Sequence, residues 1–383
     1  MGGNALKIRT QRLPADEYHR LASEITEQIQ QISGARAEPL RAYRNKADFG
    51  DLDILAAREG ALSGPLDLPP NRERRSTPIP PTPAIQALLE LAERHHARDT
   101  HRTRNSSVFS FEHRKNTEQD TGFQVDVILT EPALFQATAD YMAYNDLGNL
   151  AGRLAQTIGL KYGTEGLILE LHHDAHTRER ITLTTDTGQI HRILGLDHRK
   201  FQDGFDSLEQ IYAFVMESSL FHPAAFNLEG ANHRRRKRDA KRANYSAFLE
   251  KCQNAPGNFQ HPPTTPHEDD VIRNMAAHFP WLRQDVMARR RNHAENRKQQ
   301  EQLRIWFNGE SVSRWSGLSG KPLGDLMERL RADAGGVAEL NEKGEMWAMR
   351  RSTEIIRDMA AEHEHGPALA GTPGSIAGKI KTP

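Results

Sequence analysis

The chain has 383 residues, of which 27% are charged, and its 51 Lys and Arg residues equal its 51 Asp and Glu residues. This length leaves room for two or three domains. No run approaches the roughly 18 apolar residues that a membrane span needs, and the first residues lack an apolar signal-peptide core. We therefore expect a cytoplasmic protein with no membrane partner. The single cysteine, Cys252, excludes a disulfide framework and a cysteine-rich zinc module.

The first half of the chain alternates between helical and strand-like patterns. Apolar residues recur at helical spacing in two segments, and shorter apolar runs predict strands. Seven prolines between residues 64 and 83 predict an extended insertion. In chain order the predicted elements are a helix over 16–32, a strand over 49–55, the Pro-rich loop, a helix over 84–95, and strands over 107–111 and 122–129.

The second half becomes increasingly helical. The predicted elements are a helix over 140–158, a strand over 166–171, a hairpin over 180–184 and 189–194, and a helix over 208–221. From residue 224 the pattern is helical and charged, and the Gly/Pro/Ser-rich tail predicts disorder. The sequence thus predicts an α+β protein with a catalytic domain over 1–223, a basic helical domain over 224–365 and a disordered tail over 366–383.

A basic segment begins that helical region. Residues 233–242 hold seven Lys and Arg residues against one Asp: Arg234, Arg235, Arg236, Lys237, Arg238, Lys241 and Arg242. A block of like charges repels itself unless an anion lies nearby, so we expect these side chains to bind a nucleic-acid backbone. The alternative is an ordinary solvated helix face.

Three aspartates form the constellation with the clearest chemistry. Asp51 and Asp53 are two residues apart, so on a strand both project from one face, while Leu52 points into the core. Adjacent carboxylates repel unless a cation neutralises them, and magnesium is a hard ion that binds carboxylates together with substrate phosphates. Asp126, a lone acid in an apolar strand, supplies a third ligand. The alternatives are an exposed strand edge for the pair and a buried acid bonded to backbone amides for Asp126.

These residues resemble the palm motif of the DNA polymerase beta nucleotidyltransferase superfamily, and of its family X polymerases in particular. The segment 43–53 runs Tyr-Arg-Asn-Lys-Ala-Asp-Phe-Gly-Asp-Leu-Asp, and 124–126 is similar to the family's Arg-Val-Asp strand. The resemblance implies a palm with a mixed β-sheet and flanking helices. It also implies that Gly50 lies against the nucleotide, and that Asp51, Asp53 and Asp126 hold two Mg²⁺ ions, with Mn²⁺ as a substitute.

The likeness continues through residue 220. Segment 141–153 resembles the helix that lies over the incoming nucleotide, which implies contacts from Tyr141, Asp146, Asn149 and Arg153. Further along, 316–330 resembles a loop-helix element of tRNA CCA-adding enzymes. A capped amphipathic helix is the alternative for that element.

The triphosphate grip departs from the family pattern. The family places a Gly-Ser or Gly-Gly pair about ten residues before its Asp-x-Asp, and Arg41 and Ala42 occupy that place here. We expect Arg41, Arg44 and Lys46 to supply charge in place of the missing amide groups. The helix-hairpin-helix modules of family X polymerases have no counterpart before residue 40.

The implied function is transfer of a nucleoside monophosphate from an NTP to the 3′-hydroxyl of a nucleic acid. RNA is favoured as the acceptor, by way of the CCA-adding-like element. Three alternatives stay open. They are transfer to a protein or small molecule, as in nucleotidylating toxins, a family X-like DNA polymerase, and a catalytically silent nucleic-acid-binding protein.

Overall fold

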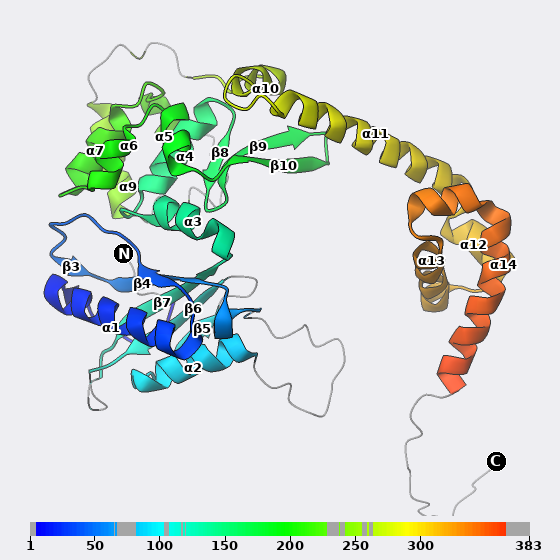
Figure 1. Ribbon diagram of the computed structural model, residues 1–383, viewed down its shortest axis with the longest axis horizontal. Coiled ribbons are helices and arrows are strands. Elements are labelled where there is room, and N and C mark those ends of the chain that lie inside the picture. The colour runs from blue at the N-terminus through cyan, green and yellow to red at the C-terminus, as the bar shows by residue number, and fades with distance from the viewer. Residues whose placement is uncertain are drawn as a thin grey trace, which may run out of the picture. The chain divides into compact units, whose positions relative to one another are not determined.

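The structure is a computed structural model that describes residues 5–64, 66, 82–102, 107–115, 118, 120–227, 237, 242–254, 259 and 263–364. It has two compact units, 1–280 and 281–383, which are described separately (Figure 1). Helices account for 56% of the described residues and strands for 16%, with a mixed five-stranded sheet in the first unit. The predicted α+β class is confirmed. No helix in the described ranges is long and apolar enough to cross a membrane.

The five-stranded sheet has the order β2-β4-β7-β6-β5. Its central pair, β4 and β7, is parallel, whereas the other neighbours are antiparallel. The strands are β2 (Ala37–Pro39), β4 (Asp51–Ala57), β5 (Thr100–Arg102), β6 (Val108–His113) and β7 (Phe123–Thr130). The predicted strands around residues 49–55, 107–111 and 122–129 are therefore confirmed.

Two helices, α1 (Ala15–Ser33) and α2 (Pro83–Arg94), cover one face of this sheet (Figure 1). Leu52 and Ile54 of β4 point toward them and are fully buried, as the alternation of the strand requires. The α2 helix begins at a Thr82 cap, whose hydroxyl accepts a hydrogen bond from the Ile85 amide. The two-residue strand β1 (Leu13–Pro14), directly before α1 in the chain, pairs with β3 (Asp48–Phe49).

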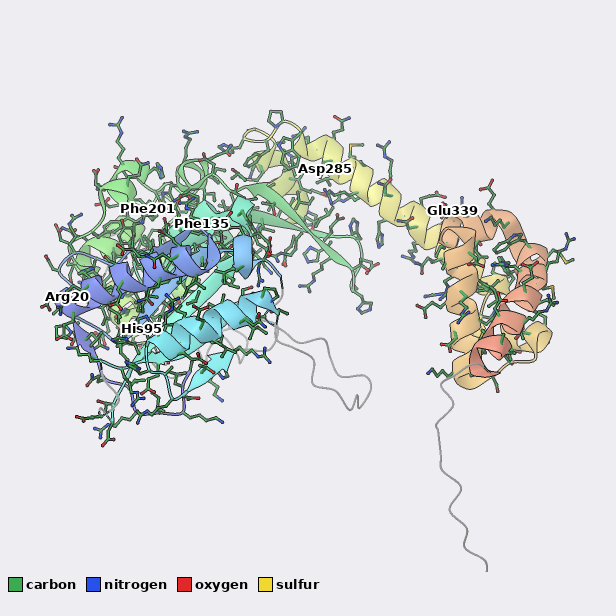
Figure 2. All side chains as sticks on the ribbon, turned by 60° about the horizontal axis from the view of Figure 1, so that its bottom comes forward. Arg20, His95, Phe135, Phe201, Asp285 and Glu339 are labelled. Atoms are coloured by element: carbon green, nitrogen blue, oxygen red, sulfur yellow. The ribbon has the colours of Figure 1, made fainter. Side chains whose placement is uncertain are left out.

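Helix α3 (Phe135–Met142) covers part of the other face of the sheet. This helix packs Phe135 and Ala139 on Leu55 and Ala57 of β4. Two short 3-10 helices, η1 (Gly60–Leu62) and η2 (Pro132–Leu134), precede it in the chain. Phe135 is labelled in Figure 2. Since side chains alternate along the strand, Asp51 and Asp53 lie on this same face, before the part that α3 covers.

The predicted helix over 140–158 is wrong at its start, because the chain turns between α3 and α4 (Leu147–Thr157). Tyr144 and Asn145 there have φ values of 56° and 63°, in the left-handed region that side chains disfavour. The Tyr144 amide donates to the Arg41 carbonyl at 2.7 Å, and the Tyr144 ring is buried beside Phe201 and Phe205. Tertiary contacts thus override the helical pattern.

The rest of the first unit is a small sheet and a group of helices. Its elements are β8 (Lys161–Gly163), β9 (Gly166–His172), β10 (Arg178–Thr184), α5 (Thr187–Ile193), α6 (His198–Asp203), α7 (Leu208–Met216), η3 (Pro223–Phe226), α9 (Ala243–Gln253) and α10 (Glu268–Met275). The predicted hairpin of 180–184 with 189–194 is wrong. β10 pairs with β9, and residues 187–193 form a helix whose N-terminus is capped by Asp186.

The first unit extends past the domain boundary predicted at residue 223. The Tyr245 hydroxyl of α9 donates to the Phe226 carbonyl at 2.7 Å, and the Tyr212 hydroxyl of α7 donates to the Asn244 carbonyl at 2.8 Å. The His172 amide of β9 donates to Glu268 of α10. These bonds keep α9 and α10 with the part of the chain that carries the two sheets, so the helical unit begins near residue 281.

The second unit is helical. Its helices are α11 (Leu282–Trp306), α12 (Gly309–Ser316), α13 (Gly320–Ala334) and α14 (Val337–Glu364), which has a non-helical residue at Gly344. The CCA-adding-like element contributes Leu326 and Leu330 of α13 to the core of this unit. The Pro-rich residues 65 and 67–81 and the tail 365–383 lie outside the described residues.

Candidate metal centre and its pocket

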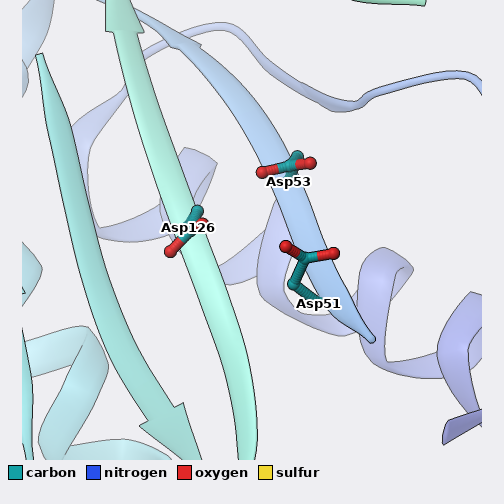
Figure 3. A group of neighbouring side chains, drawn as sticks. All are labelled: Asp51, Asp53 and Asp126. Carbon is teal, nitrogen blue, oxygen red and sulfur yellow. The ribbon is translucent and has the colours of Figure 1, made fainter. Parts of the chain in front are cut away.

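Asp51, Asp53 and Asp126 come together on the open face of the sheet. The parallel register of β4 and β7 makes Asp53 and Asp126 direct Cα partners, and places Asp51 opposite Gln124. One ligand atom from each aspartate lies within 4.8 Å of the others. Figure 3 shows the two carboxylates on β4 and the third on the neighbouring strand. The predicted triad is therefore assembled in space.

Burial of these carboxylates makes their negative charges costly. Burial is the main cause that raises the pKa of Asp53 to about 8, and the charges of Asp51 and Asp126 add to it. Burial also raises the pKa of Asp126, while hydrogen bonds from Ser110 and Gln124 lower it. A divalent cation would relieve this repulsion, and carboxylate oxygens are the ligands that hard cations prefer. The donor set fits such an ion.

Gln124 orients the third carboxylate. Its side-chain Nε2 lies 3.0 Å from Oδ1 and 2.9 Å from Oδ2 of Asp126, and its Oε1 accepts from the Ala5 amide at 2.9 Å. That acceptor bond fixes which end of the amide faces Asp126. Gln124 is 2% exposed, so the arrangement is held by the core. Gln124 was not among the predicted site residues, although its position two residues before Asp126 on a strand places both on one face.

A pocket of about 310 Å³ opens at Asp51 and Asp53. This volume lies in the range of small-molecule sites. Its walls come from α1, the segment before β4, the α3–α4 turn and the start of α9. They consist of Tyr18, Leu40, Arg41, Ala42, Lys46, Phe49, Asp51, Asp53, Tyr141, Met142, Asn145, Asp146, Asn149 and Arg242.

Several residues predicted to bind the nucleotide lie at this pocket. Tyr141, Asp146 and Asn149 reach it because the left-handed turn at Tyr144 and Asn145 redirects the chain before α4. Lys46 lies over the Phe49 ring, 4.2 Å from its centroid, and burial lowers the pKa of Lys46. Gly50 is buried directly before Asp51.

Arg41 lines the pocket but is held by other groups. Its guanidinium donates to Asp140 at 2.6 Å and lies 5.1 Å and 4.9 Å from the Tyr144 and Phe201 ring centroids. Thr187 also donates to Asp140, so the Arg41–Asp140 pair links the segment before β3 to α3 and α5.

Arg44 and Arg153 do not line the pocket. The Arg44 guanidinium donates to Asp206 at 2.5 Å and to the Asp203 carbonyl at 2.7 Å. Arg153 is 2% exposed and donates to Gln156, one turn along α4. Arginine suits phosphate binding, but the positions of Arg44 and Arg153 in the fold give these two side chains contacts within the protein instead.

Arg242 is the described residue of the basic segment that reaches the pocket. Its guanidinium forms an ion pair with Asp146, which precedes α4, and both line the pocket wall. Arg242 was expected to bind a nucleic-acid backbone. Arg234, Arg235, Arg236, Arg238 and Lys241 lie outside the described residues, and Lys237 is described only as an exposed residue.

Comparisons with protein-family models and with curated protein sequences find no match to this chain.

Proposed function

We propose that this chain is a metal-dependent nucleotidyltransferase that transfers a nucleoside monophosphate from an NTP to a hydroxyl group of a nucleic acid. The observation that carries the proposal is that ligand atoms of Asp51, Asp53 and Asp126 lie within 4.8 Å of one another. Asp51 and Asp53 also line a pocket together with cationic side chains. Asp51, Asp53 and Asp126 would hold two Mg²⁺ ions. Such ions, when bound, activate an attacking hydroxyl and neutralise a leaving pyrophosphate.

The transfer itself forms one bond and breaks one. The acceptor oxygen attacks the α-phosphorus, the bond from that phosphorus to the β-phosphate oxygen breaks, and pyrophosphate leaves. Asp126 is the acid placed to take the hydroxyl proton, because Asp51 and Asp53 face the pocket where the phosphates enter. The side chains contribute mainly positioning and charge, as in other phosphoryl transfers.

The pocket walls suit the remainder of a nucleotide. Tyr141 and Met142 form an apolar surface at the end of α3, and Asn149 offers both a donor and an acceptor from α4. RNA is the favoured acceptor, on the sequence likeness of 316–330 to an element of CCA-adding enzymes. The basic segment before α9 would make acceptor binding sensitive to salt.

The test is incorporation of label from each NTP and dNTP, with Mg²⁺ or Mn²⁺, into RNA and DNA primers with and without template. Asp51→Asn and Asp53→Asn are compared with Asp48→Asn, which removes an exposed carboxylate that pairs with Arg12 outside the pocket. Label on RNA that disappears in the first two variants and persists in the third supports the proposal. Label on DNA alone would reject RNA as the acceptor. Absence of any transfer, with nucleotide binding intact, would reject the enzymatic function.

A further inference from the structure

Tyr18 and Lys46 lie against the two faces of the Phe49 ring, at the acidic end of the pocket. Tyr18 stacks on Phe49 with 3.6 Å between ring centroids and 8° between ring planes. The Lys46 Nζ lies 4.2 Å from the same centroid. Because a ring stacked at that distance fills one face, the ammonium group occupies the other. The stack fixes two polar groups beside the strand that carries Asp51 and Asp53.

Neither polar group has a hydrogen-bond or ion-pair partner in the described ranges. Tyr18 is only 5% exposed, yet its hydroxyl makes no hydrogen bond there, and Lys46 forms no ion pair there. Both residues line the pocket together with Asp51 and Asp53. Since Tyr18 lines the pocket and its hydroxyl is not among the buried polar atoms, that hydroxyl is open to the pocket. It can therefore donate a hydrogen bond to a ligand there.

The stack is held rigidly before any ligand arrives. Leu13 of β1 pairs with Phe49 of β3, and the Ala15 amide at the start of α1 donates to the Ala47 carbonyl at 3.0 Å. These bonds join the first turn of α1, which carries Tyr18, to the strand that carries Phe49. Fixed donors lose little freedom on binding, so each contributes more to affinity.

The donor chemistry selects an anionic oxygen. At neutral pH a tyrosine hydroxyl can donate, and a lysine ammonium group has donors only. Cations bound by Asp51 and Asp53 would bring phosphate oxygens to this end of the pocket. Of the two arginines expected to bind the phosphates, Arg41 lines the pocket but pairs with Asp140, and Arg44 pairs with Asp206 outside it.

We propose that Tyr18 and Lys46, spaced by Phe49, bind the phosphate chain of the nucleotide through side-chain donors. This inference rests on the proposed nucleotidyltransferase function. It assigns to these side chains the role that backbone amides of a Gly-Ser pair have in the superfamily that the sequence resembles. Tyr18 falls within the helix predicted over residues 16–32, and its hydroxyl has no signature in the sequence.

The experiment measures binding of inorganic tripolyphosphate to the full chain by calorimetry, with saturating Mn²⁺. The variants are Tyr18→Phe, which keeps the stacked ring, and Lys46→Met. Tyr43→Phe is the control, because Tyr43 lies close in sequence but does not line the pocket. We expect about 10-fold weaker binding in Tyr18→Phe, the effect of one hydrogen bond, and a larger loss in Lys46→Met. Mn²⁺ binding alone should be unchanged in Tyr18→Phe.

Three results of the tripolyphosphate titrations would each overturn the assignment. They are unchanged tripolyphosphate affinity in Tyr18→Phe, an equal loss in Tyr43→Phe, and no tripolyphosphate binding by the unmodified chain. A matching loss of Mn²⁺ affinity in Tyr18→Phe would also overturn it, since the hydroxyl would then act on the metal. Failure of the proposed function is a separate result: no nucleotidyl transfer occurs, while tripolyphosphate still binds and still depends on Tyr18.

Discussion

Asp53 and Asp126 are direct partners across the parallel β4–β7 pair, although 72 intervening residues separate them along the chain. Their partnership places a third carboxylate beside the Asp51–Asp53 pair, and burial of the group raises the pKa of Asp53 to about 8. The folded protein therefore holds three carboxylates close enough to repel one another, and a bound cation would reduce that repulsion. Four predictions follow from this arrangement and from the pocket beside it.

The metal-free protein should lose stability as pH rises. The folded chain holds the Asp53 proton up to about pH 8, whereas an unfolded chain releases it near the ordinary value of 3.8. Between these values the folded state binds more protons, so the free energy of unfolding falls with increasing pH. Asp53→Asn removes this dependence.

In thermal denaturation with a chelator, Asp53→Asn should melt above the unmodified protein at pH 8, by roughly 2–4 °C for each kcal/mol gained. The difference should shrink toward pH 4, and Mg²⁺ should stabilise only the unmodified protein. If the melting temperatures of the two proteins changed with pH in the same way from pH 5 to pH 8, the assigned repulsion would be contradicted.

Gln124→Met should weaken divalent-cation binding by about 10- to 100-fold, which is the usual effect of losing a group that orients a metal ligand. Methionine preserves the volume but loses the donor that Asp126 accepts from. Gln136→Met is a matched control, because Gln136 donates in the same way to Asp140, away from the triad. Titration with Mn²⁺ measures the effect. Equal affinity in the Gln124 and Gln136 variants would remove the orienting role.

Arg242→Met should weaken NTP binding by about 10-fold or more, since a charged hydrogen bond to phosphate contributes about 1.5–3 kcal/mol. Arg242 reaches the pocket through its ion pair with Asp146, and an entering phosphate can replace that partner. Arg44→Met removes a guanidinium that contacts Asp206 outside the pocket, so NTP affinity should hardly change. Fluorescence titration with a labelled NTP compares the two variants. A greater loss of NTP affinity in the Arg44 variant would instead support the prediction from the sequence that Arg44 binds the phosphates.

Gly148→Ala should destabilise the protein, because a Cβ atom there would lie 1.9 Å from the Tyr141 carbonyl oxygen. The α3 and α4 helices would have to separate, at a cost of about 1–3 kcal/mol. Gly152→Ala, one turn further along α4, meets only the Tyr162 carbonyl oxygen at 3.5 Å and should be neutral or stabilising by up to about 1 kcal/mol. Urea denaturation gives both values. Similar stability of the two variants would show that the α3–α4 turn adapts.

Local sequence determined much of the candidate metal site. Alternation along a strand puts Asp51 and Asp53 on one face and Leu52 on the other, whatever the rest of the chain does. The helices over residues 15–33 and 83–94 follow from apolar spacing and, at the second, from the Thr82 cap. These features depend on backbone geometry and on neighbours within a few residues, which the sequence displays directly.

Contacts between distant segments decided which side chains come together at the triad and along the pocket wall. The parallel register brought Asp126 to Asp53, and packing of Tyr144 on Phe201 and Phe205 broke a helix that the apolar pattern predicted. Arg242 pairs with Asp146, which lies 96 positions earlier in the chain, while Arg44 pairs with Asp206. An arginine offers the same charge in every context, so the sequence alone determined which residues can bind phosphate. Only the tertiary structure decided which of them face the pocket, because that choice depends on the nearest buried or acidic partner.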